Sequence, residues 1–213
     1  SLLIEGNEQE AAKFGEVIDS FNQDRKSIDR NVTQEAHDYV ESHPELKALK
    51  STVIYNPKWM KGIVGIVASR LIETYYRPTV VLTKSNGFVT GSARSVAGFD
   101  LYQAVESCSD LLENFGGHMY AAGLTMKEEN VEKFTKRFND YVEKNIDPSI
   151  LVPQVDIDCE LLFSEITDEF HRQLNSFQPF GPGNPAPVFM TRGTSNRGDA
   201  KRVGVECDHL RMD

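Results

Sequence analysis

Hydrophobic residues recur at three- and four-residue spacing through the first part of the chain, which predicts one amphipathic helix over residues 7–42. Asn7, with Glu10 three residues later, suits the start of this helix, and His43-Pro44 suits its end. Such a helix would span about 50 Å. That length favours a connector between two lobes over a core helix. The apolar stripe comprises Phe14, Ile18, Phe21, Ile28, Val32, Ala36 and Tyr39.

Residues 51–126 alternate short β-rich runs with helical patterns, and a further amphipathic helix follows. Asn86-Gly87 is a strong hairpin signal, and Asp100 with Gln103 can begin a helix. The fold class expected is α/β, with a small mixed sheet and flanking helices. Expected strands are Thr52–Tyr55, Thr79–Thr83, Phe88–Ser92 and Leu124–Met126, and expected helices are Gly62–Tyr76, Asp100 to about Glu113, and Glu128–Lys144.

The character of the chain changes after Asp147-Pro148. Strands are expected over 153–163, 188–194 and 202–212, and the proline- and glycine-rich stretch 177–189 between them forbids helix. The chain stops within the last of these strands, which suggests a truncated β-rich module. We therefore expect three parts: a connector helix over 1–47, an α/β domain over 48–147 and a partial β module over 148–213.

Composition is that of an ordinary soluble protein, with a net charge of −9. No run of apolar residues is long enough for a membrane helix. The chain begins at Ser1 rather than Met, which favours a piece cut from something longer. Cys108, Cys159 and Cys207 are far apart and lack metal-ligand spacing, so we read them as free thiols in the cytoplasm.

The charge is unevenly distributed. Residues 58–99 carry six basic residues against one acidic residue, a balance of +5, and residues 190–202 have a balance of +3. A locally basic face on an acidic protein is compatible with binding a phosphate backbone. Helices also segregate charge on solvated faces, so this signal alone is weak.

The segment 114–123 contains Gly116, Gly117 and His118, followed by Ala121-Ala122-Gly123. We expect the glycine pair to open a short helical turn whose free N–H groups favour a phosphate, with Gly123 at its left-handed exit. His118 would donate a hydrogen bond to the same anion. The alternative is a tight turn with a solvated histidine, and composition alone favours it.

A second candidate follows the third expected strand, where Ser92 and Ser95 flank Arg94. A guanidinium between two hydroxyls suits the gripping of phosphate, although a surface loop with one exposed arginine fits as well. Trp59 could stack on a base, but a lone tryptophan before an apolar helix more often belongs to the core. The sequence has no P-loop, nucleophile elbow or local pair of catalytic carboxylates.

Taken together, these motifs resemble a known family. Trp59–Leu71, Arg77-Pro78, Gly91–Ser95 and Gly116–Gly123, in this order and spacing, resemble the DHH-associated domain of the DHH phosphoesterase superfamily. Gly181–Pro185 with Val188-Phe189 resembles the oligonucleotide-binding-fold module of the RecJ branch of that superfamily. The resemblance covers nearly the whole chain. One departure is Met60, where the family usually has histidine and where we expect packing rather than a polar role.

The resemblance implies a single-strand-specific 5′-to-3′ DNA exonuclease of recombination and repair, whose partner is single-stranded DNA and not a membrane. It implies Mn²⁺ or Mg²⁺ held by an Asp-His-His domain that we do not find here, so this chain would carry no metal and would be inactive alone. Ser92, Arg94 and Ser95 would hold backbone phosphate. Gly116, Gly117 and His118 would position the scissile phosphate, with His118 in a supporting catalytic role.

Two alternatives remain at this point. The chain could be a lobe of a nanoRNA or cyclic-dinucleotide phosphodiesterase, or a non-catalytic RNA-binding module. The Gly-Pro-Gly-Asn-Pro segment at 181–185 and the β-rich residues after it argue against both. Protein partners are not indicated by the sequence.

Overall fold

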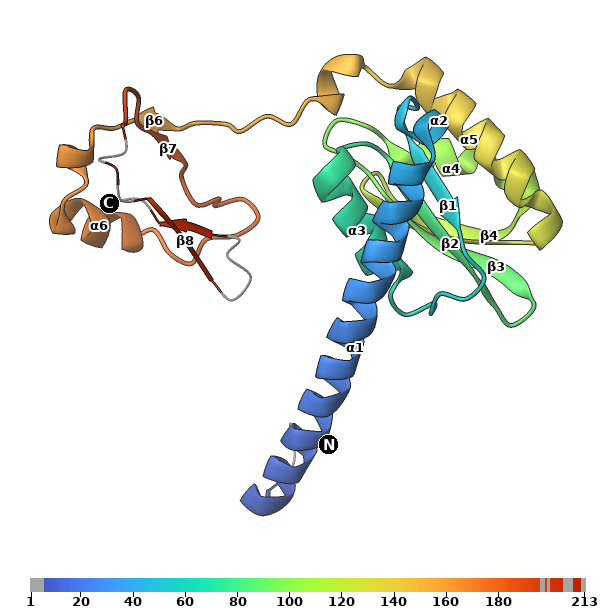
Figure 1. The fold of residues 1–213 in the computed structure, drawn as a ribbon, viewed down its shortest axis with the longest axis horizontal. Helices are drawn as coiled ribbons and strands as arrows, with labels where there is room; N and C mark the ends of the chain where they lie inside the picture. Colours follow the sequence, from blue (N-terminus) through green and yellow to red (C-terminus); the bar gives the residue numbers. More distant parts are fainter. Residues whose placement is uncertain (1–5, 196–197, 199, 205–208, 212–213) are drawn as a thin grey trace. The chain divides into compact units, whose positions relative to one another are not determined.

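The computed structural model describes residues 6–195, 198, 200–204 and 209–211. The chain divides into two compact units, one ending at Pro153 and the other beginning at Gln154 (Figure 1). Each unit is described by itself below.

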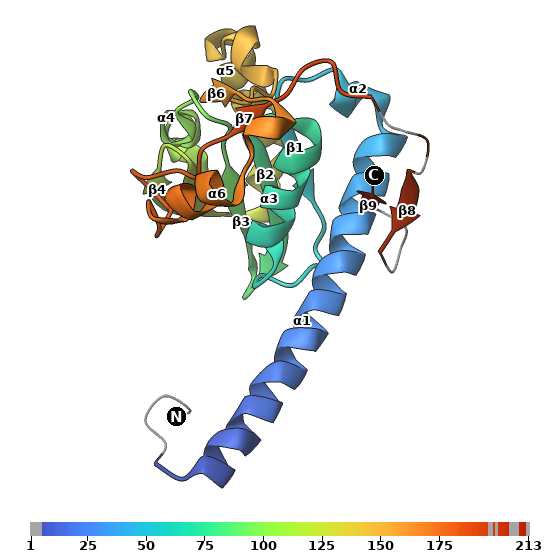
Figure 2. The same cartoon turned by 90° about the vertical axis from the view of Figure 1, so that its left-hand side faces the viewer.

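The first unit opens with the long helix α1, Glu8–Ser42, as predicted. The side chain of Asn7 caps it by accepting hydrogen bonds from the backbone N–H groups of Gln9 and Glu10. Only Val32, Ala36 and Val40 of this helix are buried, all in its second half. The first half extends beyond the α/β domain (Figures 1 and 2). The short helix α2, Pro44–Lys47, follows.

A five-stranded mixed sheet forms the centre of this unit, in the order β1-β2-β3-β5-β4. Only the β1–β2 pair is parallel, because α3 crosses between those strands, and the other neighbours are antiparallel. The Asn86-Gly87 turn has positive φ at both residues (51° and 81°), as the hairpin signal predicts. The strands are β1 Thr52–Tyr55, β2 Thr79–Ser85, β3 Phe88–Arg94, β4 Leu112–His118 and β5 Ala121–Met126.

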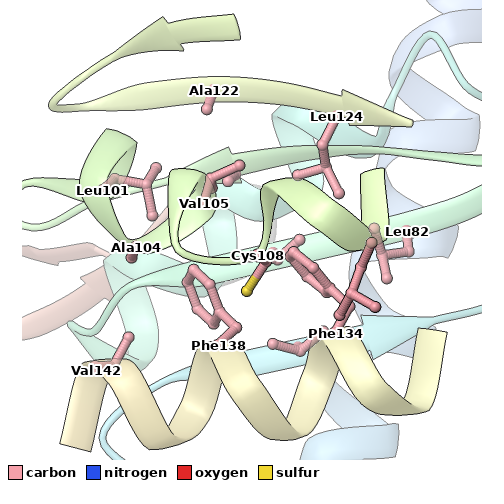
Figure 3. Packing of buried hydrophobic residues seen from close by; sticks show 14 of the residues in the cluster. Leu82, Leu101, Ala104, Val105, Cys108, Ala122, Leu124, Phe134, Phe138 and Val142 are labelled. Carbon is pink, nitrogen blue, oxygen red and sulfur yellow. The ribbon is translucent and has the colours of Figure 1, made fainter. Parts of the chain in front are cut away.

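Helices cover both faces of the sheet, which confirms the expected fold class. The helices of this domain are α3 Val64–Tyr75, α4 Leu101–Glu106 and α5 Val131–Asn145. On one face α4 and α5 pack Val105, Phe134 and Phe138 against Leu82 and Leu124 of the strands (Figure 3). On the other face α3 and the second half of α1 form a separate core (Figure 2).

Two local predictions are wrong. The helix expected from Asp100 to about Glu113 ends at Glu106, although Asp100 does cap it, and a 3₁₀ turn over Ser109–Leu111 follows. The helical turn expected over 116–123 is instead a β-hairpin, in which β4 pairs with β5. Glycine pairs are poor helix formers, and pairing with the neighbouring strand satisfies the backbone groups that a helix would have satisfied.

The second unit has less regular structure than expected. The strand predicted over 153–163 is reduced to β6, Cys159–Glu160, which pairs with β7, Phe189–Met190. An unpredicted helix, α6 Asp168–Asn175, begins at Thr167, whose hydroxyl accepts from the N–H of Phe170. Strands β8, Lys201–Val203, and β9, His209–Arg211, form a hairpin, while part of the predicted strand 202–212 lies outside the described residues. None of the described residues of this unit is buried.

A hydrogen bond between α3 and α1 makes the free energy of unfolding of the first unit vary with pH in the alkaline range. The Tyr75 hydroxyl donates to Glu41 at 2.9 Å. Burial and then this hydrogen bond raise the pKa of Tyr75 from its ordinary value of 10.0 to about 12. A raised folded-state pKa contributes stability that is complete below the unfolded pKa and is lost as pH rises through the folded pKa.

We therefore predict that Tyr75→Phe lowers the free energy of unfolding at pH 8, and that the difference from the unmodified protein shrinks between about pH 10 and pH 12. Urea titrations across this range measure it. Tyr39→Phe is the control, because Tyr39 is an exposed tyrosine of α1 whose hydroxyl has no partner among the described residues. A constant difference at every pH would contradict the coupling.

Candidate nucleic-acid interface

The register of the sheet brings four of the predicted site residues to one face. Arg94 on β3 lies opposite Ala121 on β5, which lies opposite His118 on β4. In the neighbouring row, Ser92, Gly123 and Gly116 are aligned in the same way. Directly opposed residues in antiparallel strands share a face. Ser92, Arg94, Gly116 and His118 therefore lie on the face opposite the core formed with α4 and α5.

Arg94 is half-buried beneath the start of α3. Its Nη1 donates to the Ser92 hydroxyl at 2.7 Å and to the Ala93 carbonyl at 2.9 Å, which fixes the guanidinium plane. A methyl group on Gly65 would lie 3.1 Å from Nη2, so glycine lets α3 approach this closely. No carboxylate in the described part of the chain pairs with Arg94, and Nε and Nη2 remain available as donors.

A hollow of about 460 Å³ lies between α3 and Arg94 and is lined by Gly62, Gly65, Ile66, Ser69, Arg70, Glu73 and Arg94. Helix α3 has no side-chain cap at its first turn, where Gly62 and Gly65 line the hollow. Uncapped N–H groups and the positive end of the helix dipole favour an anion. A helix start of the kind that we predicted at Gly116 is absent there, since that segment is a β-hairpin, and the uncapped start of α3 lies next to Arg94 instead.

His118 is exposed, at the end of β4. Its Nδ1 accepts a hydrogen bond from the N–H of Tyr120 at 3.3 Å, so the neutral ring carries its proton on Nε2. The hairpin tip is held by two backbone bonds, from Ser95 N–H to the Tyr120 carbonyl and from Leu101 N–H to the Met119 carbonyl, both 3.0 Å. His118 thus presents one N–H donor from a supported turn.

The two predicted glycines of this motif differ in what the fold requires of them. Gly117 has a φ of 153°, and a methyl group there would lie 2.2 Å from the Ala121 carbonyl oxygen. A methyl group on Gly116 would meet nothing within 4 Å. The fold therefore requires glycine at position 117, whereas at position 116 glycine leaves an open surface.

Ser95 lies just beyond β3, and its side chain is occupied within the protein. Its hydroxyl donates to the Phe99 carbonyl at 2.9 Å, which ties the loop after β3 to itself. The structure thus groups Ser92, Arg94, Gly116 and His118, and it places Ser95 and Gly117 where they support the loop and the hairpin.

Sequence reasoning missed residues of this face that the tertiary structure supplies. A glycine inside a helix, such as Gly65, lowers helix stability by about 1 kcal/mol relative to alanine. A glycine at such a position was the available sign that another group approaches the helix closely. Gly123 was expected at a helix exit but lies in β5, beside Gly116. Lys61 and Asn114 line a second hollow over the sheet, and neither was given a binding role on the basis of the sequence.

Only some of the basic side chains of residues 58–99 lie at this face. Arg77 is buried, where its guanidinium donates to the Thr52 hydroxyl and to the Lys47 and Leu49 carbonyls, and burial lowers its pKa. Lys84 forms an ion pair with Glu128 at 2.7 Å. Lys61, Arg70 and Arg94 are the cations that line the two hollows.

Trp59 and Met60 have opposite environments. The Trp59 ring is buried and donates to Glu35 at 2.9 Å, which confirms the core interpretation. Met60 is 54% exposed, so the packing role expected for it is wrong.

Among the described residues no group of three or more His, Cys, Asp and Glu side chains could hold a metal ion, so these residues do not fit a resident Mn²⁺ or Mg²⁺. Cys108 is a buried free thiol and Cys159 an exposed one, and Cys207 lies outside the described residues. In the described part of the chain, no helix combines the length and apolarity needed to cross a bilayer.

Comparison with known proteins identifies both units. Residues 47–144 match the DHHA1 domain, and residues 157–213 match the RecJ OB domain. The chain is 34% identical to the single-stranded-DNA-specific exonuclease RecJ of Bacillus subtilis (strain 168), over 99% of this chain and 27% of that protein. The chain is RecJ-like, with a DHHA1 domain followed by a RecJ OB domain. RecJ of Escherichia coli (strain K12) is also 34% identical, over 89% of this chain and 34% of that protein.

Solved RecJ structures agree with this assignment. The crystal structure of RecJ in complex with Mg²⁺ from Thermus thermophilus matches with a TM-score of 0.81 at 29% identity, over 95% of this chain and 31% of that chain. The matches confirm the resemblance drawn from the motifs. The chain spans between 27% and 38% of the length of the curated RecJ relatives.

The contrast between the adjacent glycines leads to a prediction. Gly117→Ala should lower the free energy of unfolding by about 2 kcal/mol or more, because the methyl group meets the β5 backbone. Gly116→Ala should change it by less than about 0.5 kcal/mol, because its methyl group meets open space. Chemical denaturation of both variants measures this, and equal effects would contradict the assigned hairpin register.

Proposed function

We propose that this chain is the strand-gripping part of a metal-dependent exonuclease that hydrolyses single-stranded DNA from 5′ to 3′ in recombination and repair. The observation that carries the proposal is the shared face of Arg94, Ser92, Gly116 and His118, on which Gly116 leaves open space. The RecJ relatives, named as single-stranded-DNA-specific exonucleases, supply the substrate class.

The chemistry of this face suits a phosphodiester chain. The guanidinium of Arg94 keeps donors available on Nε and Nη2, and a phosphate can accept from both at once. The uncapped start of α3 adds backbone donors and positive potential to the same hollow. Arg70 lines this hollow too, in an exposed ion pair with Glu73 that is worth little against a bound phosphate.

His118 would act on the reacting phosphate. Its Nε2–H can donate to a non-bridging oxygen and stabilise the negative charge that grows there during hydrolysis. The relatives' structures with Mg²⁺ and with Mn²⁺ support metal dependence of the whole enzyme. These metals would lie in a domain other than the one described here, and we infer that this chain binds a strand without cutting it.

The second unit would add to strand binding. Its match to the RecJ OB domain supports a groove for single-stranded DNA, a role in which aromatic stacking and basic side chains cooperate. Phe163 and Phe177 are 69% and 66% exposed and could stack on bases. This match also supports a RecJ-type substrate over the nanoRNA, cyclic-dinucleotide and RNA-binding alternatives. Free thiols at Cys108 and Cys159 support action in the cytoplasm.

Arg94→Ala should weaken binding of a 5′-phosphorylated oligothymidylate by about 10-fold or more, because charge-assisted hydrogen bonds to phosphate are lost. Fluorescence anisotropy at low salt measures this, with circular dichroism as the check on folding. Arg25→Ala is the matched control, since it removes the same charge from an exposed site on α1. Unchanged affinity in Arg94→Ala would place Arg94 outside the strand-binding surface.

His118→Ala in the full-length enzyme should lower the rate of cleavage by about 100-fold while affinity changes little, because the donor acts most strongly on the transition state. Single-turnover cleavage and equilibrium binding separate the two effects. Tyr120→Ala tests whether a change in the neighbouring ring, 6.1 Å away between centroids, is sufficient to cause the loss. A wild-type cleavage rate in His118→Ala would remove this residue from the mechanism.

A further inference from the structure

A second hollow, of about 370 Å³, lies on the same face of the sheet as Arg94 and His118. Its lining includes Lys61 from the turn before α3 and side chains or backbone from the three strands β3, β5 and β4. The residues on which the argument depends are Lys61, Thr90, Asn114, Gly116, Gly123 and Thr125.

The strand register places this hollow next to the site at Arg94 and His118, along the direction of the strands. Gly116 and Gly123 are paired, in the row next to the one that holds His118. Asn114 is paired with Thr125, which is paired with Thr90 on β3. Asn114 lies four positions before His118 on β4, a distance of about 14 Å along an extended strand. The face therefore extends beyond Arg94 and His118 by more than the length of one nucleotide in a single strand.

The floor of this hollow is kept free of side chains. A methyl group on Gly116 would meet nothing within 4 Å, and one on Gly123 would lie 4.0 Å from its nearest neighbour, the Gly91 carbonyl oxygen. Glycine inside a strand weakens the strand and marks a place where another group approaches the backbone closely. Because the fold does not require glycine at these two positions, the open floor is available to a ligand.

Two polar side chains at the rim of the hollow have no partner in the described part of the chain. No carboxylate pairs with the ammonium group of Lys61, and the side-chain amide of Asn114 has no hydrogen-bond partner there. By contrast, the Thr90 hydroxyl is already used, since it donates to the Leu124 carbonyl. A cation and an amide above a flat polar floor suit an anionic group attached to a sugar.

We propose that this hollow is a second nucleotide subsite, which holds the sugar and phosphate next to the nucleotide gripped by Arg94. Lys61 binds the phosphate, Asn114 binds the sugar or an edge of the base, and the Gly116–Gly123 floor accepts the backbone. The subsite has no group arranged to distinguish one base from another by paired hydrogen bonds, so it accepts any sequence. This inference rests on the proposed function of the Arg94 face.

Binding of 5′-phosphorylated thymidylates of increasing length, from a mononucleotide to a short oligomer, tests the subsite. NMR titration suits the mononucleotide and fluorescence anisotropy suits the oligomers. Lys61→Met should leave mononucleotide affinity unchanged and weaken oligomer binding by about fivefold to tenfold, with the slope of log affinity against log salt reduced by about 0.7. Lys58→Met is the matched control, because Lys58 is an exposed lysine three positions earlier that lines neither hollow.

Filling the floor gives a second, independent variant. Gly123→Leu should preserve the melting temperature to within a few degrees and remove the gain in affinity between mononucleotide and oligomer. If Gly123→Leu unfolds the protein, Lys61→Met together with Asn114→Ala decides the question.

The outcomes separate the two proposals. If Arg94→Ala weakens the mononucleotide while Lys61→Met and Asn114→Ala bind oligomers like the unmodified protein, the subsite is wrong and the strand-gripping role stands. If Arg94→Ala has no effect on any length, the proposed function itself fails. A loss in Lys58→Met equal to that in Lys61→Met would show a general charge effect and overturn the subsite.

Discussion

Close backbone packing between β4 and β5 holds the candidate interface together. Gly117 allows this approach, because any side chain there would enter the backbone of β5 at Ala121. Once β4 is paired in this register, His118 is aligned with Arg94 across a single intervening strand. A shift of one residue would turn His118 to the opposite face. The face therefore depends on a steric requirement at one position more than on any attraction between its polar groups.

A second close approach determines how near α3 lies to the sheet. Gly65 lets α3 lie directly above Ser92 and Arg94, and this brings the uncapped start of the helix to the same hollow. The core under α3, which includes Val67 and Leu71, keeps the helix in place. Glycine thus serves two different purposes here, since Gly65 and Gly117 permit packing, whereas Gly116 and Gly123 leave room above the sheet.

The sequence predicted those elements that are determined by residues close together in the chain. Helix α1 and the Asn86-Gly87 hairpin were both assigned correctly, because each depends on neighbouring residues alone. The predicted apolar stripe is buried only in the second half of the helix, and Phe14, Ile18, Phe21 and Tyr39 are exposed. Strand β4 was missed because its segment is rich in glycine and lacks an alternating apolar pattern, so only its partner β5 makes it a strand. Helix α6 was missed because eight residues give a short periodic signal within a segment rich in turns.

The candidate site was predictable as a set of chemical groups but not as a surface. Ser92, Arg94 and His118 were identified by residue type and by resemblance, yet their common face follows from register across three strands. Charge counting along the sequence was misleading, since it could not show that Arg77 is buried among carbonyl oxygens. Lys61 and Asn114 lie within motif segments of the sequence but were given no binding role, which became visible only when the fold brought them to the same hollow.

The donors on this face explain how a protein with a net charge of −9 could hold a polyanion. Attraction at long range would be weak, because exposed charges are screened beyond about 10 Å in ordinary salt. At contact, however, the guanidinium of Arg94 and the start of α3 act over a few ångströms, in a hollow where no described carboxylate pairs with Arg94. Binding through a few oriented donors and an open floor would not depend on which base follows, which agrees with the strand-gripping role proposed above.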